Sequence, residues 1–188
     1  MRDILSILNL PCQEAAEFPP QRRIIKIDLG GKINTFYLPF PYFQFYFFSH
    51  LILGSGKLLY VSWSLLPVEN NNAITCRPFL PNIASRGVVC LGKDNPKSLK
   101  EAITQFWNTT FTSFELTSYI SDLLNYFDTG DDREDEYDDE YNVKLIVSAL
   151  NKWQSKPGNV FNKPLPVTYY YLNFHKIIEQ EMRRLINA

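Results

Sequence analysis

The chain is poor in the residues that metal sites and disulfide frameworks require. It contains three cysteines, Cys12, Cys76 and Cys90, in 188 residues. Because this number is odd and the spacing wide, we expect no disulfide framework and thiols that stay reduced in a cytoplasm. The two histidines, His50 and His175, are too far apart in the sequence to form a ligand pair on one helix. The sequence therefore predicts no metal site.

A strong charge of either sign is also missing. Nineteen basic residues against twenty acidic ones give a formal net charge of −1. This is not the dense positive field that attracts phosphate backbones, so we expect no nucleic-acid partner. The first ten residues lack the long apolar run and the small-residue cleavage site of a signal peptide. The predicted location is therefore the cytoplasm.

The chain has no long uninterrupted hydrophobic run. Its most apolar stretch, residues 36–54, contains Pro39, Pro41, Gln44 and the pair Ser49-His50. Proline removes backbone donors and unpaired polar groups are costly in lipid, so we expect no membrane-spanning helix. Aromatic residues, at 15% of the chain, are dense in this stretch. We expect them to form a β-rich aromatic core instead.

Local patterns predict one α+β domain over residues 1–188. Apolar runs separated by Gly-containing turns predict a four-stranded antiparallel meander, with strands at residues 23–29, 33–38, 42–53 and 57–66. Apolar residues at helical spacing predict an N-terminal helix before Pro11 and several C-terminal helices; the helical patterns cover residues 3–10, 95–106, 112–127, 143–153 and 174–185. Asn95, followed by Pro96, is the expected N-cap of the second helix, and Thr112, in capping-box spacing with Glu115, that of the third. We interpret residues 12–21 as a polar connector.

One segment has a composition unlike the rest of the chain. Residues 128–140 contain nine carboxylates and one basic residue, Arg133. Such a run does not compact without strong like-charge repulsion, so we expect a mobile, solvated loop over residues 128–141.

The segment between the predicted sheet and the next helix carries a motif with chemical meaning. Asn82 precedes Cys90 by eight residues, Gly87 precedes it by three, and Leu91 follows it. With Pro81, this pattern resembles the active-site segment of ubiquitin-conjugating enzymes, in which His-Pro-Asn is followed by Gly-x-x-Cys-Leu at the same spacing.

The differences from the eukaryotic enzymes are specific. Leu80 stands at the family's histidine, Gly92 stands where an acidic or polar residue is usual, and the next helix follows the cysteine sooner. These features look like the prokaryotic branch of the family, which includes protein B of the plasmid-associated PRTRC system.

The resemblance implies a ubiquitin-conjugating-enzyme-like (UBC-like) fold and a role for each motif residue. Cys90 would accept the C-terminus of a ubiquitin-like protein as a thioester, since a thiolate is both a nucleophile and a good leaving group. Asn82 would stabilise the oxyanion or hold the loop, while Pro81, Gly87, Leu91 and Gly92 would shape it. The implied partners are a ThiF-like adenylating enzyme and a ubiquitin-like protein. No cofactor is implied, because adenylation on the partner supplies the energy.

Two other interpretations stay open. The chain could be a catalytically inactive UBC-like adaptor of a plasmid or mobile-element system, in which Cys90 is dispensable. Alternatively, the motif is coincidental, the chain is a structural component of a plasmid or phage assembly, and Cys90 is a buried core cysteine, a common environment for this residue. In each case we interpret Cys12 and Cys76 as structural.

Overall fold

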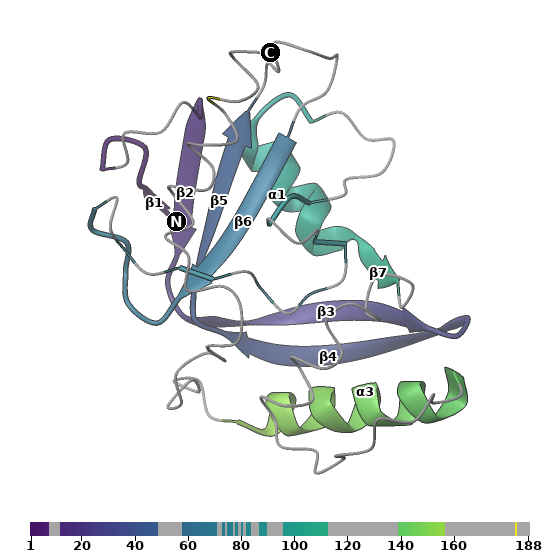
Figure 1. The fold of residues 1–188 in the computed structure, drawn as a ribbon. Helices are drawn as coiled ribbons and strands as arrows, with labels where there is room; N and C mark the ends of the chain where they lie inside the picture. Colours follow the sequence, from purple (N-terminus) through teal and green to yellow (C-terminus); the bar gives the residue numbers. More distant parts are fainter. Residues whose placement is uncertain are drawn as a thin grey trace.

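The computed structural model describes most of the first 112 residues and one later helix. The described residues are 1–7, 12–48, 58–70, 73, 75–76, 78, 80, 82–83, 87–89, 96–112, 139–156 and 183. Their strands are β1 (Arg2–Asp3), β2 (Glu14–Phe18), β3 (Gln21–Leu29), β4 (Lys32–Phe40), β5 (Tyr42–Phe48), β6 (Leu58–Ser64) and β7 (Thr110–Thr112). The helices are α1 (Leu99–Asn108) and α3 (Asp139–Ser155). The predicted α+β class is confirmed (Figure 1).

The strands form two sheets. Sheet A has the order β1-β2-β5-β6 and is antiparallel, and sheet B has the order β4-β3-β7 with β7 parallel to β3. The predicted hairpins β3–β4 and β5–β6 are both confirmed. Gly30 and Gly31 make the first turn with φ values of 64° and 83°, in the left-handed region that glycine adopts without steric cost.

The prediction of one continuous four-stranded meander is wrong. β4 and β5 belong to different sheets, although a single residue, Pro41, separates them in the chain. Proline has no backbone N–H and cannot donate to a ladder, so it suits a position at which the chain leaves one sheet for another. The edge of β5 that β4 would have occupied pairs instead with β2.

The prediction of an N-terminal helix is wrong for the residues that the structure describes. Arg2 and Asp3 form β1, and the expected polar connector contains β2. Pairing with β5 satisfies the backbone of β2 and buries Ala15, Ala16 and Glu17. The predicted N-terminal helix, with three apolar residues, would give less stabilisation, because helices of this length are marginally stable without extensive packing.

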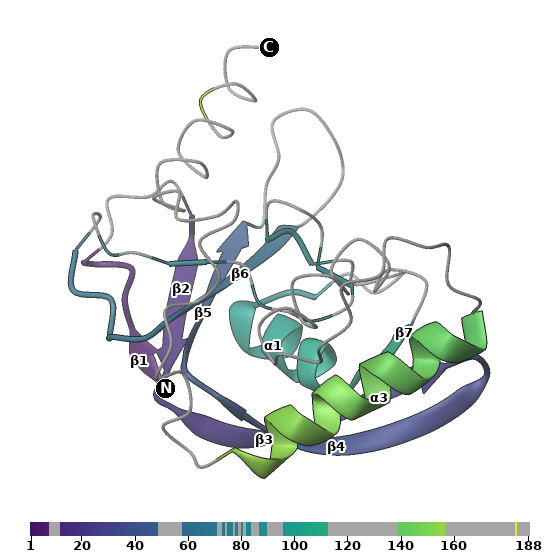
Figure 2. The same cartoon turned by 60° about the horizontal axis from the view of Figure 1, so that its bottom comes forward.

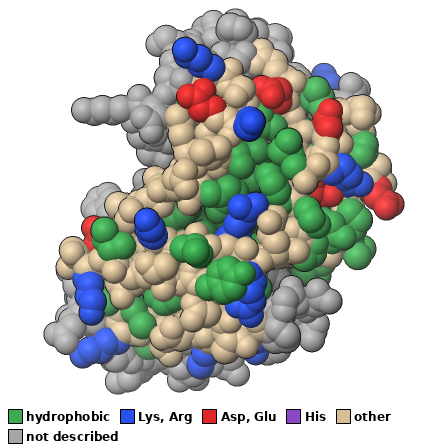
Figure 3. All heavy atoms as spheres, turned by 180° about the vertical axis from the view of Figure 1, so that it is seen from behind, with side chains coloured by type: hydrophobic (Ala, Val, Ile, Leu, Met, Phe, Trp, Pro, Cys, Tyr) green, Lys and Arg blue, Asp and Glu red, His purple; other side chains and the backbone are tan. Residues whose placement is uncertain are grey.

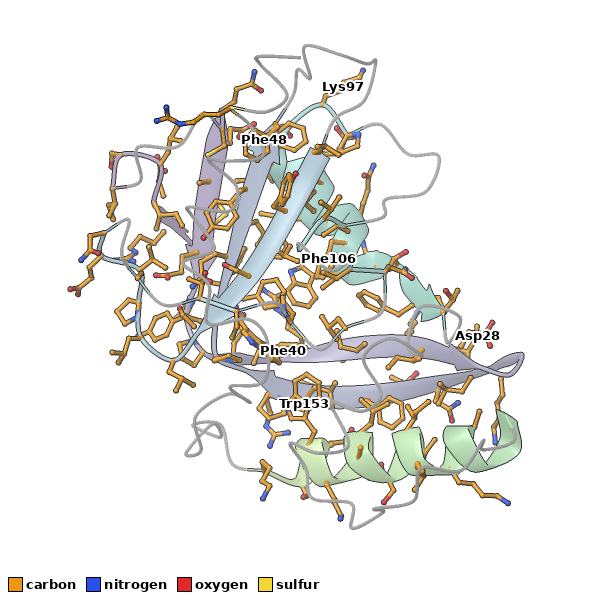
Figure 4. All side chains as sticks on the ribbon, in the orientation of Figure 1. Asp28, Phe40, Phe48, Lys97, Phe106 and Trp153 are labelled. Atoms are coloured by element: carbon orange, nitrogen blue, oxygen red, sulfur yellow. The ribbon has the colours of Figure 1, made fainter. Side chains whose placement is uncertain are left out.

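The main core lies between the two sheets, α1 and α3, and it is aromatic as predicted (Figures 1, 2 and 4). Phe40 on β4 lies at its centre, with ring centroids 5.3 Å from Trp153 and 5.8 Å from Phe43. Trp153 is fully buried, and its indole nitrogen donates a hydrogen bond of 2.9 Å to the carbonyl of Pro39. This bond ties α3 to β4.

Helix α1 has the apolar face that the sequence predicts. Leu99, Ala102, Ile103 and Phe106 are buried. The N-cap, however, is Ser98, whose side chain accepts a hydrogen bond from the backbone N–H of Glu101, and not Asn95. A serine three residues before a glutamate is a favourable N-terminal capping arrangement, which explains the later start.

Helix α3 confirms the pattern predicted for residues 143–153. Its buried residues include Ile146, Leu150 and Trp153. It begins at Asp139, so residues 139–141 of the expected acidic loop are helical. The rest of that loop lies outside the described residues, as do most of the helices predicted over residues 112–127 and 174–185. Thr112, expected to cap the former helix, ends strand β7.

A second, smaller cluster covers the other face of sheet A. It comprises Ile4, Cys12, Ala15, Tyr46, Phe48, Tyr60 and Val68. The N-terminal residues and the segment after β6 supply the cover, so sheet A is buried on both faces. No helix in the described part of the chain is long and apolar enough to cross a bilayer.

Candidate functional site

The motif segment is attached to the edge of β6. The backbone N–H of Val61 donates to the carbonyl of Gly87, and the N–H of Val89 donates to the carbonyl of Leu59, both at 2.8 Å. An antiparallel bridge joins Tyr60 and Val88 between them. Residues 87–89 therefore continue sheet A beyond β6, because their main-chain groups pair as a short added strand.

The same segment folds back on itself. Ile83 and Val89 form an antiparallel bridge, and both side chains are buried. Ile83 directly follows Asn82 in the sequence, and Val89 directly precedes Cys90. The bridge therefore brings together the two described residues that flank the predicted site pair.

Asn82 has an unusual backbone conformation and a partner that the sequence did not indicate. Its φ is 61°, in the left-handed region where asparagine is among the few side chains that are well tolerated. Its side-chain oxygen accepts a hydrogen bond of 3.4 Å from the hydroxyl of Thr112, the last residue of β7. The half-buried Asn82 side chain thus connects the motif segment, which is attached to sheet A, with sheet B.

Gly87 supplies the second special conformation. Its φ is 82°, and the residue is buried. A side chain at this φ costs roughly 1–2 kcal/mol, so glycine is the residue that fits.

Leu80 explains one difference from the eukaryotic motif. Its side chain is 1% exposed and belongs to the main core. At this position an imidazole would have to be buried with a hydrogen-bond partner, whereas leucine simply packs. The motif segment therefore begins at a leucine packed in the core, Leu80, and not at a titratable side chain.

The predicted site residues divide into two groups. Asn82 and Gly87 lie in the described segment and are connected through the Ile83–Val89 bridge. Pro81, Cys90, Leu91 and Gly92 lie outside the described residues, as do His50 and His175. The residue that sequence reasoning missed is Thr112, because its spacing to Glu115 indicated a helix cap.

The two other cysteines are poor nucleophiles. Burial raises the pKa of Cys12 to about 11, with a smaller contribution of the same sign from Asp3. Burial also raises the pKa of Cys76 well above its ordinary value, and its thiol donates to the carbonyl of Trp63 at 3.6 Å. Since the thiolate is the reactive form, neither side chain is suited to acyl transfer at neutral pH.

No protein-family model, curated protein or solved structure matches this chain. The architecture defines the class as an α+β protein with two mainly antiparallel sheets. The resemblance of residues 81–91 to the active-site segment of ubiquitin-conjugating enzymes stays a prediction from the sequence.

Proposed function

We propose that the chain is a UBC-like carrier that accepts the C-terminus of a ubiquitin-like protein on Cys90 and transfers it to an acceptor. The observation that carries this proposal is the bridge between Ile83 and Val89. The bridge pairs the residue that follows Asn82 with the residue that precedes Cys90. A site that uses an amide and a thiol together needs the chain to fold back in this way.

The properties of the other thiols support the choice of Cys90. Cys12 is buried in the second cluster, and Cys76 is bonded to β6 through its backbone and its thiol. Both thiols have raised pKa values because of burial. A cysteine that carries an acyl group must be accessible and must form a thiolate readily. Cys12 and Cys76 do not meet this requirement.

The proposed chemistry takes place in two balanced steps. The Cys90 thiolate attacks the activated carbonyl carbon of the ubiquitin-like C-terminus, forms a thioester and releases the activating group. An acceptor amine then attacks the thioester carbonyl, forms an amide, loses a proton and expels the Cys90 thiolate. The amide nitrogen of Asn82 is the donor for the oxyanion, since its oxygen already accepts from Thr112.

The order of elements supports a UBC-like arrangement. Two hairpins, β3–β4 and β5–β6, precede the motif segment, and α1 follows it. In this proposal β1, β2 and the separation of β4 from β5 are departures from the family pattern. The partners we propose are a ThiF-like adenylating enzyme, which charges Cys90, and the ubiquitin-like protein it activates.

Reconstitution tests the proposal. The protein is incubated with ATP, a ThiF-like adenylating enzyme and a ubiquitin-like protein, and adducts are separated without reductant. We expect an adduct that dithiothreitol cleaves, and in Cys90→Ser an ester that resists it. Cys12→Ser and Cys76→Ser are the matched controls and should keep the wild-type adduct. An adduct that survives in Cys90→Ala, or none with wild type, contradicts the proposal.

A second candidate function is a UBC-like adaptor without transfer activity. It is favoured by Leu80 in the core at the histidine position, and by the cross-strand pair Ile24 and Tyr37, which is 58% and 52% exposed. Exposed apolar pairs of this kind serve docking better than catalysis. Alkylation by iodoacetamide at neutral pH separates the two functions: fast modification of Cys90 supports the carrier, and modification as slow as that of Cys12 supports the adaptor.

A further inference from the structure

Arg23 on β3 lies against an aromatic platform. Its guanidinium carbon is 5.1 Å from the centroid of the Trp107 ring on α1 and 5.4 Å from that of Phe18 on β2. Both rings pack against aromatic residues of β5. The ring centroids of Trp107 and Phe43 are 5.1 Å apart, and those of Phe18 and Phe45 are 5.7 Å apart in an edge-on contact. The guanidinium is therefore stacked on rings that are themselves packed on the core.

Arg23 differs in its polar contacts from Arg2 and Arg22, the two arginines that precede it in the chain. Arg2 pairs with the carboxylate of Glu17 at 2.6 Å, and Arg22 donates to the carbonyls of Tyr37, Gln154 and Lys156. Arg23 has ring contacts but no side-chain hydrogen bond or ion pair with any residue that the structure describes. Its Nε is buried without an acceptor, and the Nε1 of Trp107 is also a buried donor without one.

This arrangement carries an energetic cost that the fold does not offset. Of the five N–H donors of Arg23, the Nε–H is buried without an acceptor, and a buried donor without an acceptor loses its hydration energy. Burial accordingly lowers the pKa of Arg23. Stacking on Trp107 and Phe18 offsets part of this loss, and an acceptor from outside the chain would offset more of it. A cation without an acceptor, on a rigid apolar platform, is typical of a binding hot spot.

The shape and charge of the surroundings indicate the kind of ligand. Strand alternation directs the neighbouring cation, Arg22, to the opposite face of β3, so Arg23 acts as a single planar fork. A carboxylate matches such a fork with two parallel hydrogen bonds, whereas phosphate sites commonly combine several donors. The space-filling view from behind shows that one face of the molecule has hydrophobic side chains gathered across its middle, with basic side chains set among them (Figure 3).

We propose that Arg23, stacked on Trp107 and Phe18, is the docking point for a carboxylate side chain of a partner protein, flanked in that partner by apolar residues. The carboxylate pairs with the guanidinium, and the apolar neighbours cover the two rings. This site does not involve Cys90 or Asn82, so it stands or falls separately from the transfer function.

Two peptides that differ in one group test the proposal. Acetyl-Leu-Glu-Leu-amide and acetyl-Leu-Gln-Leu-amide are titrated into the full chain, with the Nε–H signal of Arg23 and the indole N–H signal of Trp107 followed by NMR. We expect saturable shifts with the Glu peptide and affinity at least about tenfold weaker with the Gln peptide. Methyl phosphate is a third ligand. Tighter binding of methyl phosphate than of the Glu peptide would overturn the carboxylate assignment.

Three variants make the result specific. Arg23→Gln should abolish the shift of the Trp107 indole signal, and Arg23→Lys should weaken binding about tenfold, because lysine keeps the charge but lacks the fork. Arg22→Gln is the matched control, with wild-type binding expected. Circular dichroism melting checks that each variant is folded. Absence of a saturable shift in wild type, or equal binding by folded Arg23→Gln, would overturn the proposal.

Discussion

Gln44 on β5 donates a hydrogen bond of 2.9 Å to the carboxylate of Glu17 on β2, and both side chains are buried within sheet A. The same carboxylate accepts from Arg2 and from the backbone N–H of Val68. Gln44 continues the network to Ser62 and Ser64 on β6. A buried acid with three donors therefore joins the start of the chain to three strands of sheet A.

Replacement of Glu17 by leucine should destabilise the protein strongly. The substitution leaves Arg2, Gln44 and the N–H of Val68 without their acceptor, and breaking a buried charged network from one side costs about 3–5 kcal/mol. Urea unfolding followed by circular dichroism measures the loss. Glu69→Leu, at an exposed position, is the control, with a change within about 0.5 kcal/mol. A loss for Glu17→Leu no larger than that of the control would show that the network contributes little.

Removal of the Trp153 side chain should detach α3 from β4. Trp153→Ala leaves a cavity beside Phe40 and removes the bond to the carbonyl of Pro39. Substitutions of this type cost about 3–5 kcal/mol. The same unfolding measurement applies, because it does not depend on tryptophan fluorescence. Asn151→Ala, on the exposed side of α3, should behave as wild type; equal midpoints for the two variants would argue against this packing.

Gly87→Ala should strain the motif segment without disturbing the main core. Alanine at φ near 82° costs roughly 1–2 kcal/mol. Hydrogen exchange should show faster exchange of the Val61 and Val89 amides, whose bonds hold the segment on β6. Amides of the β3–β4 hairpin are the internal reference. Unchanged protection at Val61 and Val89 would show that the segment accepts a side chain there.

The Cys12 thiol should react with iodoacetamide in a strongly pH-dependent way. In a Cys76→Ser, Cys90→Ser variant, the rate should rise about tenfold per pH unit and level off near the raised pKa of about 11. An exposed thiol, with an ordinary pKa of about 8.5, levels off earlier. The sign follows from burial, which favours the neutral thiol. A plateau below pH 9 in the folded protein would contradict the buried position of Cys12.

Linkage gives the corresponding effect on stability. Between about pH 8.5, the ordinary thiol pKa, and about pH 11, the unfolded chain releases the Cys12 proton while the folded chain keeps it. The free energy of unfolding should therefore fall as the pH rises through this window. Cys12→Ala should make the free energy of unfolding depend less steeply on pH. Urea midpoints measured across the window for both chains check this. Identical slopes would show that Cys12 does not titrate differently on folding.

Several elements were predictable because their signal is local. The Gly30-Gly31 turn with flanking apolar alternation indicates β3–β4, and apolar residues at helical spacing indicate α1 and α3. In the motif segment, Gly87 was expected to shape the loop, and it adopts a positive φ. A turn or an amphipathic helix face depends on residues that are close together in the sequence, so it can be predicted without knowledge of the rest of the fold.

The remaining features depend on partners distant in the sequence. Residues 14–18 form a strand because they pair with an edge of β5, and this pairing places β4 and β5 in different sheets on either side of Pro41. Thr112 meets Asn82, and Arg23 meets Trp107, across elements far apart in the chain. The sequence by itself determined the two hairpins, the aromatic core and two helices. The tertiary structure alone decided the sheet order, the buried Glu17 network and the half-buried Arg23 guanidinium, because long-range pairing and desolvation outweigh local preference.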